Sequence, residues 1–150
     1  MAAINTRNVH RSNMLLSHQY GSDFVYDEML MTGPGEKGET IAKAVASDKG
    51  MMKDGGPKPG EGPSKEEREN GFYEVLFVGN DQDGQNLTVS VGATLDPGYG
   101  STSRMITEAA LCLIKDSTDT PGGILTPASA MGDTLIKRLV DNAGLTFKQL

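Results

Sequence analysis

The chain has 150 residues, a length typical of one domain, and 37% of them are hydrophobic, which describes a soluble globular protein. Its net charge of −6 excludes the basic face that a nucleic-acid-binding protein needs. The longest apolar run, residues 109–114, is too short for the ~20 residues that cross a bilayer. No apolar signal segment follows Arg7 and Arg11, so we expect a cytoplasmic protein without membrane association.

The first third of the sequence predicts two helices and one strand. Residues 8–17 and the short, alanine-rich segment 36–48 have the pattern of helices. Residues 24–31 are rich in aromatic and branched side chains, which indicates a strand, although Asp27 and Glu28 blur its alternation. These elements precede a marked change in composition.

A glycine- and proline-rich stretch separates this part from the rest. Residues 50–63 contain five glycines and three prolines in fourteen positions, which cannot bury apolar surface. We therefore expect a long flexible loop, a disordered insertion at about 49–64, within a single domain that spans residues 1–150. Trypsin is expected to cut first between Lys49 and Lys65.

The remaining residues predict a hairpin followed by two long helices. Ser64 is the expected N-cap of a short helical turn, with Glu67 as its capping-box partner. Residues 72–78 form an almost continuous apolar run, typical of a strand covered on both faces or of one with a long apolar face. Residues 87–91 alternate with period two, and the intervening loop carries an Asp-Gly turn signal at 83–84.

Both long helices have clear boundaries. Apolar side chains three and four residues apart predict a helix over 101–115. Thr126 followed by Pro127 is an N-cap with proline at the first helical position, and this helix is expected to stop at Gly144. The elements together predict an α+β fold, a mostly antiparallel mixed sheet with helices packed on one face.

The turn before the first long helix contains a possible phosphate-binding signal. Gly98 and Gly100 lie two apart between a predicted strand and a helix, as in a dinucleotide-binding loop. However, Ser103 occupies the third glycine position, which favours a plain strand-to-helix turn about three to one. Tyr99 between the glycines could reach a neighbouring pocket or be an ordinary surface aromatic residue.

A basic N-terminal face is a second candidate. Arg7 and Arg11 lie four residues apart on one helical face, to which His18 would return three turns later. This face could bind an anion or a partner's carboxylate, or it could be a solvated face that balances the acidic remainder. His10 and His18 differ by about 80° around a helix, which excludes a shared metal ion.

The sequence contains no complete catalytic motif. Cys112 lies within the apolar run of its helix, so we expect a buried, unreactive thiol that forms no internal disulfide. No nucleophile elbow, P-loop or paired histidine and aspartate is present.

Three stretches nevertheless resemble one family. Residues 4–13 (INTRNVHRSN), 96–105 (DPGYGSTSRM) and 122–132 (GGILTPASAMG) are similar to the carboxy-terminal region of saccharopine dehydrogenase-like oxidoreductases, in the branch that includes trans-acting enoyl reductases. Members of this family begin with a Rossmann domain that binds NADP or NAD, and that domain has no counterpart in these residues.

The resemblance implies a division of labour. This chain alone is expected to bind no cofactor and no metal, and to form one wall of a substrate cleft and a homodimer surface, with the nicotinamide supplied by the Rossmann domain. Asn5, Arg7, Arg11 and Tyr99 are the residues that we expect to face the cleft, whereas Thr126 is a helix cap. A non-enzymatic binding or scaffold module of the same fold is the alternative, and an independent small enzyme is the third choice.

Overall fold

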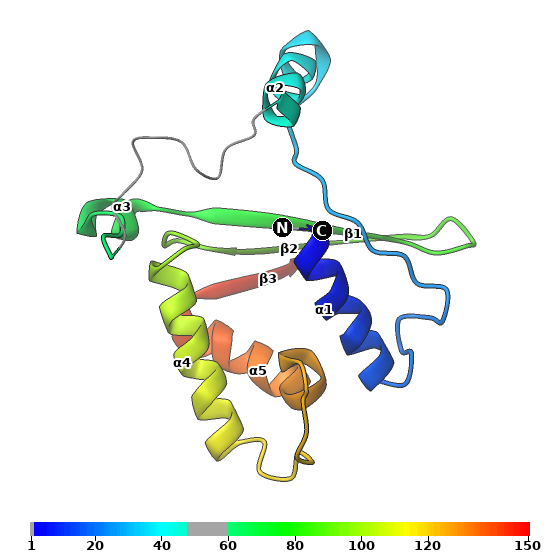
Figure 1. Cartoon of the computed structure of the whole chain (residues 1–150), viewed down its shortest axis with the longest axis vertical. Helices are drawn as coiled ribbons and strands as arrows, with labels where there is room; N and C mark the ends of the chain where they lie inside the picture. Colours follow the sequence, from blue (N-terminus) through cyan, green and yellow to red (C-terminus); the bar gives the residue numbers. More distant parts are fainter. Residues whose placement is uncertain (1, 48–59) are drawn as a thin grey trace. The chain divides into compact units, whose positions relative to one another are not determined.

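A computed structural model describes residues 2–47 and 60–150 (Figure 1). The chain forms two compact units, residues 1–60 and 61–150. Within the described ranges there are five helices and three strands, and all strand pairs are antiparallel. The predicted α+β class is confirmed.

In the first unit, helix α1 (Ala2–Leu15) starts earlier and ends earlier than predicted. It stops because the side chain of Asn13, only 4% exposed, closes the following turn: it accepts a hydrogen bond from the N–H of Tyr20 and donates one to the carbonyl of Gly21. Ser17 and His18 both have positive φ, so His18 does not continue the helix. The predicted return of His18 to the Arg7 and Arg11 face is therefore wrong.

The strand predicted at residues 24–31 is also wrong, because this segment has no regular secondary structure. Strand propensity needs a neighbouring strand to pair with, and no strand forms in the described residues of this unit. The ring of Phe24 instead packs edge-on against His10, with 5.8 Å between ring centroids, while Val25 and Met29 remain exposed. Helix α2 (Gly35–Ser47) follows, as expected for the alanine-rich segment.

The second unit begins with a short helix, α3 (Lys65–Asn70). Its predicted capping box is confirmed: Ser64 Oγ accepts from the N–H of Glu67 at 3.2 Å, and the Glu67 carboxylate accepts from the N–H of Ser64 at 2.8 Å. Most of the insertion expected at 49–64 lies outside the described residues, and residues 61–64 have no regular secondary structure. The Arg68 guanidinium donates to the carbonyl of Pro63 at 2.6 Å, which fixes the end of this stretch.

The sheet contains the predicted hairpin and one further strand. Strands β1 (Tyr73–Asn80) and β2 (Asn86–Ala93) pair antiparallel, and the order in the sheet is β1-β2-β3. Strand β3 (Leu145–Gln149) was not predicted, although its side chains alternate, with Leu145 buried and Thr146 exposed. It starts directly after Gly144, the left-handed C-cap of the preceding helix.

Helices α4 (Gly100–Lys115) and α5 (Pro127–Ala143) cover one face of this sheet (Figure 1). The predicted N-cap Thr126 is confirmed, since its hydroxyl accepts the N–H of Ser129 at 3.3 Å. The centre of the core is small. It consists of Ala93, Ala143 and Leu145, with Tyr73, Met105, Leu139 and Phe147 packed around them.

Strand β1 is much more exposed than its apolar sequence indicates. The end of the hairpin extends past α4 and α5 (Figure 1), and every residue of β1 after Tyr73 is exposed. Of the two alternatives that the sequence left open for this strand, coverage on both faces is therefore wrong.

No helix within the described ranges is both long and apolar enough to span a membrane.

Candidate functional site

The turn between β2 and α4 is held by one carboxylate. Asp96 accepts hydrogen bonds from the backbone N–H groups of Gly98, at 3.0 Å, and Tyr99, at 2.9 Å, and from that of Gly100 as well. Its own carbonyl accepts from the N–H of Ser101 at 2.9 Å. The N–H groups of Tyr99, Gly100 and Ser101 are among those that helix geometry leaves without partners at an N-terminus.

The environment of this carboxylate favours its charged form. Desolvation works against ionisation, but the backbone N–H groups of Tyr99, Gly100 and Gly98 and the positive charge of Arg68 outweigh it and lower the pKa of Asp96. The negative charge also lies at the positive end of the α4 dipole. Asp96 therefore stabilises the start of α4.

This arrangement decides between the two interpretations of the glycine turn. A bound phosphate would need the same N–H groups that Asp96 already occupies, and it would meet a negative charge there. The turn does not fit a dinucleotide. Its glycines belong to a plain strand-to-helix turn, which is the interpretation that the sequence favours.

Tyr99 lies at the N-cap position of α4 and is 56% exposed. Its ring lies close to Gly62, where an added Cβ would be 3.5 Å from two ring atoms. Two residues further on, the buried Ser101 hydroxyl shares a 2.9 Å hydrogen bond with the hydroxyl of Tyr73 on β1. The turn is therefore rigidly attached to the sheet, and it presents the Tyr99 side chain to solvent.

The other three predicted cleft residues lie on α1, in the first unit. Asn5 is half-buried, whereas Arg7 and Arg11 are exposed. The structure brings these three together on one helix, and it places Tyr99 in the second unit. Their shared role in a cleft stays a prediction.

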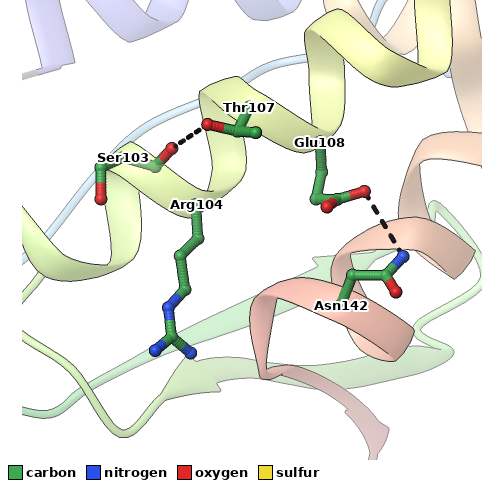
Figure 2. Close-up of a pocket in the computed structure, with 5 residues that line it drawn as sticks. All are labelled: Ser103, Arg104, Thr107, Glu108 and Asn142. Atoms are coloured by element: carbon green, nitrogen blue, oxygen red, sulfur yellow. Dashed lines mark hydrogen bonds between the residues drawn. The ribbon is translucent and has the colours of Figure 1, made fainter.

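A pocket that the sequence did not indicate lies between α4 and α5 (Figure 2). It is shallow and open, with a volume of about 270 Å³. The five residues that line it all have polar side chains: Ser103, Arg104, Thr107, Glu108 and Asn142. The Ser103 and Thr107 hydroxyls donate to helix carbonyls, so their oxygen lone pairs remain available as acceptors.

The floor of this pocket is fixed by an ion-pair network. Arg138 on α5 contacts Glu108 at 2.9 Å and Asp116 at 2.6 Å. The hydrogen bond with Asp116 is the largest cause of a raised pKa of the Arg138 guanidinium, and the contact with Glu108 adds to it. The Asn142 amide also donates to Glu108, at 3.4 Å. Glu108 is therefore paired from the α5 side with an arginine that it shares with Asp116.

Arg104 is the cation that the pocket leaves available. It is exposed, and it forms no ion pair with any other residue in the described part of the chain. Figure 2 shows its side chain on the opposite side of the pocket from Glu108, with its guanidinium turned away from the Glu108 and Asn142 pair. A planar guanidinium with free donors suits a carboxylate or a phosphate.

Sequence reasoning missed Asp96, Arg104 and Arg138. An Asp followed by Pro and Gly is a signal for a side chain that bonds to the following backbone, so Asp96 could have been found. The partners of Arg138 are 22 and 30 residues away, and no local pattern reports such a pair. Cys112 is fully buried, as predicted, with its sulfur 3.6 Å from the Ser117 hydroxyl.

Comparison with known proteins finds similarity to one named group. A Mycobacterium tuberculosis protein named provisionally as a trans-acting enoyl reductase is 36% identical over 93% of this chain. Trans-acting enoyl reductases of Mycobacterium ulcerans and Mycobacterium bovis are 33% and 31% identical over 90% and 92% of the chain. No family model matches the chain, and no solved structure gives a significant match.

The similarity covers only part of each relative. The chain spans 38% of the length of the first Mycobacterium tuberculosis relative, and 36% and 37% of the other two. Nearly the whole chain therefore corresponds to one region of larger proteins that are named trans-acting enoyl reductases.

Proposed function

We propose that this chain is the substrate-facing and dimerisation region of a saccharopine dehydrogenase-like, NAD(P)-dependent oxidoreductase that acts on an enoyl group. The observation that carries the proposal is the alignment itself, which covers 93% of the chain but 38% of its relative. The remaining length of such a relative offers room for a separate nucleotide-binding domain. In this proposal a Rossmann domain supplies the nicotinamide, and residues 1–150 do not bind it.

The start of α4 supports this division of labour. The glycines of this turn are the residues that could have bound a phosphate, and the Asp96 carboxylate occupies the backbone N–H groups there. The Asp96 side chain therefore competes with any dinucleotide phosphate at this helix end. A region with this feature contributes substrate binding and orientation rather than the hydride donor.

Within this proposal, Arg104 anchors an anionic group of the substrate. The pocket provides an exposed guanidinium, and Glu108 is already paired with Arg138. Asn5, Arg7 and Arg11 on α1 and Tyr99 at the turn are each proposed to contact the substrate. Reduction of an enoyl double bond adds a hydride to one carbon and a proton to the other, so the substrate must be held in one orientation.

A domain exchange tests the proposal. The matching region of the 36% identical Mycobacterium tuberculosis relative is replaced by residues 1–150 of this chain, and NADPH-dependent reduction of an enoyl thioester is measured. We expect the chimera to retain activity that is lost when the region is deleted. A folded chimera that binds NADPH and reduces no enoyl substrate accepted by the relative would contradict the proposal and favour the non-enzymatic scaffold.

A further inference from the structure

Strand β1 is an open edge of the sheet. It pairs with β2 on one side only, because the strand order is β1-β2-β3. Its other side presents backbone N–H and C=O groups that form no strand ladder within the described residues. An unpaired edge of eight residues is a template for a further strand.

The side chains along this edge are apolar on both faces. Four consecutive residues, Val75, Leu76, Phe77 and Val78, are 45%, 40%, 46% and 58% exposed. Because successive side chains of a strand point to opposite faces, Val75 and Phe77 lie on one face and Leu76 and Val78 on the other. A partner must therefore be an extended strand that is apolar on both of its own faces.

None of the usual devices that block edge pairing is present in β1. The strand contains no lysine and no proline, and its register with β2 runs without a bulge from Tyr73 to Asn80. Its one charged residue, Glu74, accepts a hydrogen bond from the Ser90 hydroxyl on β2. That carboxylate is therefore held toward the paired side and away from the open edge.

We propose that the open edge of β1 pairs antiparallel with β1 of a second copy of this chain. A partner must be an extended strand that is apolar on both faces, and β1 is itself such a strand. A two-fold dimer uses the same surface on both copies. A second copy is favoured because the apolar residues occupy the middle of the strand and its polar residues lie at the two ends. Pairing would join two three-stranded sheets into one continuous sheet.

Charge permits this arrangement. With the two-fold axis at the Phe77 position, Phe77 of one copy lies opposite Phe77 of the other, and Glu74 lies opposite Asn80. The two Glu74 positions are then about 20 Å apart along the strands, more than twice the Debye length at physiological salt. The apolar centres of the two strands face each other without opposing like charges.

This inference rests on the dimerisation part of the proposed function and is independent of the redox part. Sedimentation of the 150-residue chain over a concentration series measures it directly. We expect a species of twice the 15.9 kDa chain mass. Val78→Lys is expected to shift the chain to monomer, with the dimer dissociation constant raised on the order of tenfold or more. Ile106→Lys, at an apolar position of α4 that is 68% exposed, is the matched control and should leave the dimer intact.

A second measurement guards against a variant that does not fold. Phe77→Cys lies on the proposed two-fold axis and should form an intermolecular disulfide on mild oxidation, whereas Ile106→Cys should not. A wild-type chain that remains monomeric, a folded Val78→Lys variant that still dimerises, or equal cross-linking of the two cysteine variants would overturn the inference. None of these results bears on whether the domain exchange restores enoyl reduction, so the two proposals fail separately.

Discussion

The carboxylate of Asp96 accepts the backbone N–H of Tyr99 at 2.9 Å, so helix α4 starts on a charge that belongs to the chain itself. This contact turns a glycine-containing turn that resembles a phosphate loop into an internally satisfied helix cap. The backbone of Asp96 attaches the same turn to α3, because its N–H donates to the carbonyl of Arg68 at 3.1 Å.

The depressed pKa of Asp96 predicts a specific pH dependence of stability. The folded state favours the ionised carboxylate, so its contribution is present above the unfolded pKa of about 4 and is lost as the pH falls through the lower folded pKa. Asp96→Asn should therefore lower the melting temperature at neutral pH and flatten the loss of stability in acid. Thermal unfolding measured between neutral and acidic pH tests this.

Two further variants separate Asp96 from other carboxyl groups. Glu67 also has a lowered pKa, through its hydrogen bonds with the Ser64 backbone and side chain, so Glu67→Gln should remove a second part of the same acid dependence. Asp133→Asn, at an exposed position of α5, is the control for the removal of one surface carboxylate. Equal curves for Asp96→Asn and Asp133→Asn would show that the Asp96 cap does not stabilise α4.

Arg138 is predicted to be the main electrostatic link between α4 and α5. Its side chain is 21% exposed, and it contacts Glu108, which is 13% exposed, and Asp116. Arg138→Met keeps the length of the side chain but leaves the half-buried Glu108 charge without its cation, which is costly. We expect a clear decrease in the denaturant midpoint at neutral pH.

Lys137 gives the matched control for Arg138. It forms an ion pair with Asp141 at 2.5 Å, but the two side chains are 78% and 50% exposed, so water screens their interaction. Lys137→Met should change the free energy of unfolding by about 0.5 kcal/mol or less. If both substitutions have this small effect, the Arg138 network does not hold the helices together.

Gly132 is predicted to be required for its backbone conformation. It lies inside α5 with φ 46° and ψ −131°, where the helix is kinked, and an added Cβ would meet no atom within 4 Å. Gly132→Ala should therefore destabilise the chain by roughly 1–3 kcal/mol through backbone strain alone. Gly122→Ala has equally open surroundings, without a positive φ, and should be nearly neutral. Chemical denaturation of both variants compares the two, and equal stability would contradict the strain.

Arg104 is predicted to affect substrate binding. In the domain-exchange chimera, Arg104→Gln should raise KM for an anionic enoyl substrate about tenfold and change kcat little, since it removes one charge-assisted contact. Lys137→Gln, an exposed cation on α5, is the control for general charge effects. An unchanged KM for Arg104→Gln would exclude the pocket from substrate binding.

Local signals in the sequence predicted those parts of the fold that depend on neighbouring residues. Ser64 with Glu67, and Thr126 with Pro127, mark helix starts through contacts within four residues, and both are confirmed. The Asp-Gly turn at 83–84 likewise places the β1–β2 hairpin. Such interactions form within short segments, so residue types at fixed spacing report them.

Features that depend on distant partners could not be predicted. Residues 24–31 have strand propensity but lack a partner strand in their unit, while β3 is only five residues long and is defined by its pairing with β2. The pocket beside Arg104 exists because α4 packs against α5, and the kink at Gly132 has no sequence signal beyond the glycine itself. Of the residues at the α4 turn and in the pocket beside it, only Tyr99 was a predicted cleft residue, and its role in a cleft stays a prediction.

Direct titration of the isolated 150-residue chain with NADPH and with NADH tests the central claim most simply. Nicotinamide fluorescence should not change on addition of the chain, because Asp96 blocks the turn at α4 and the proposed nucleotide-binding domain lies outside these residues. Saturable binding of either dinucleotide, or its oxidation by the chain with an enoyl substrate, would contradict the account.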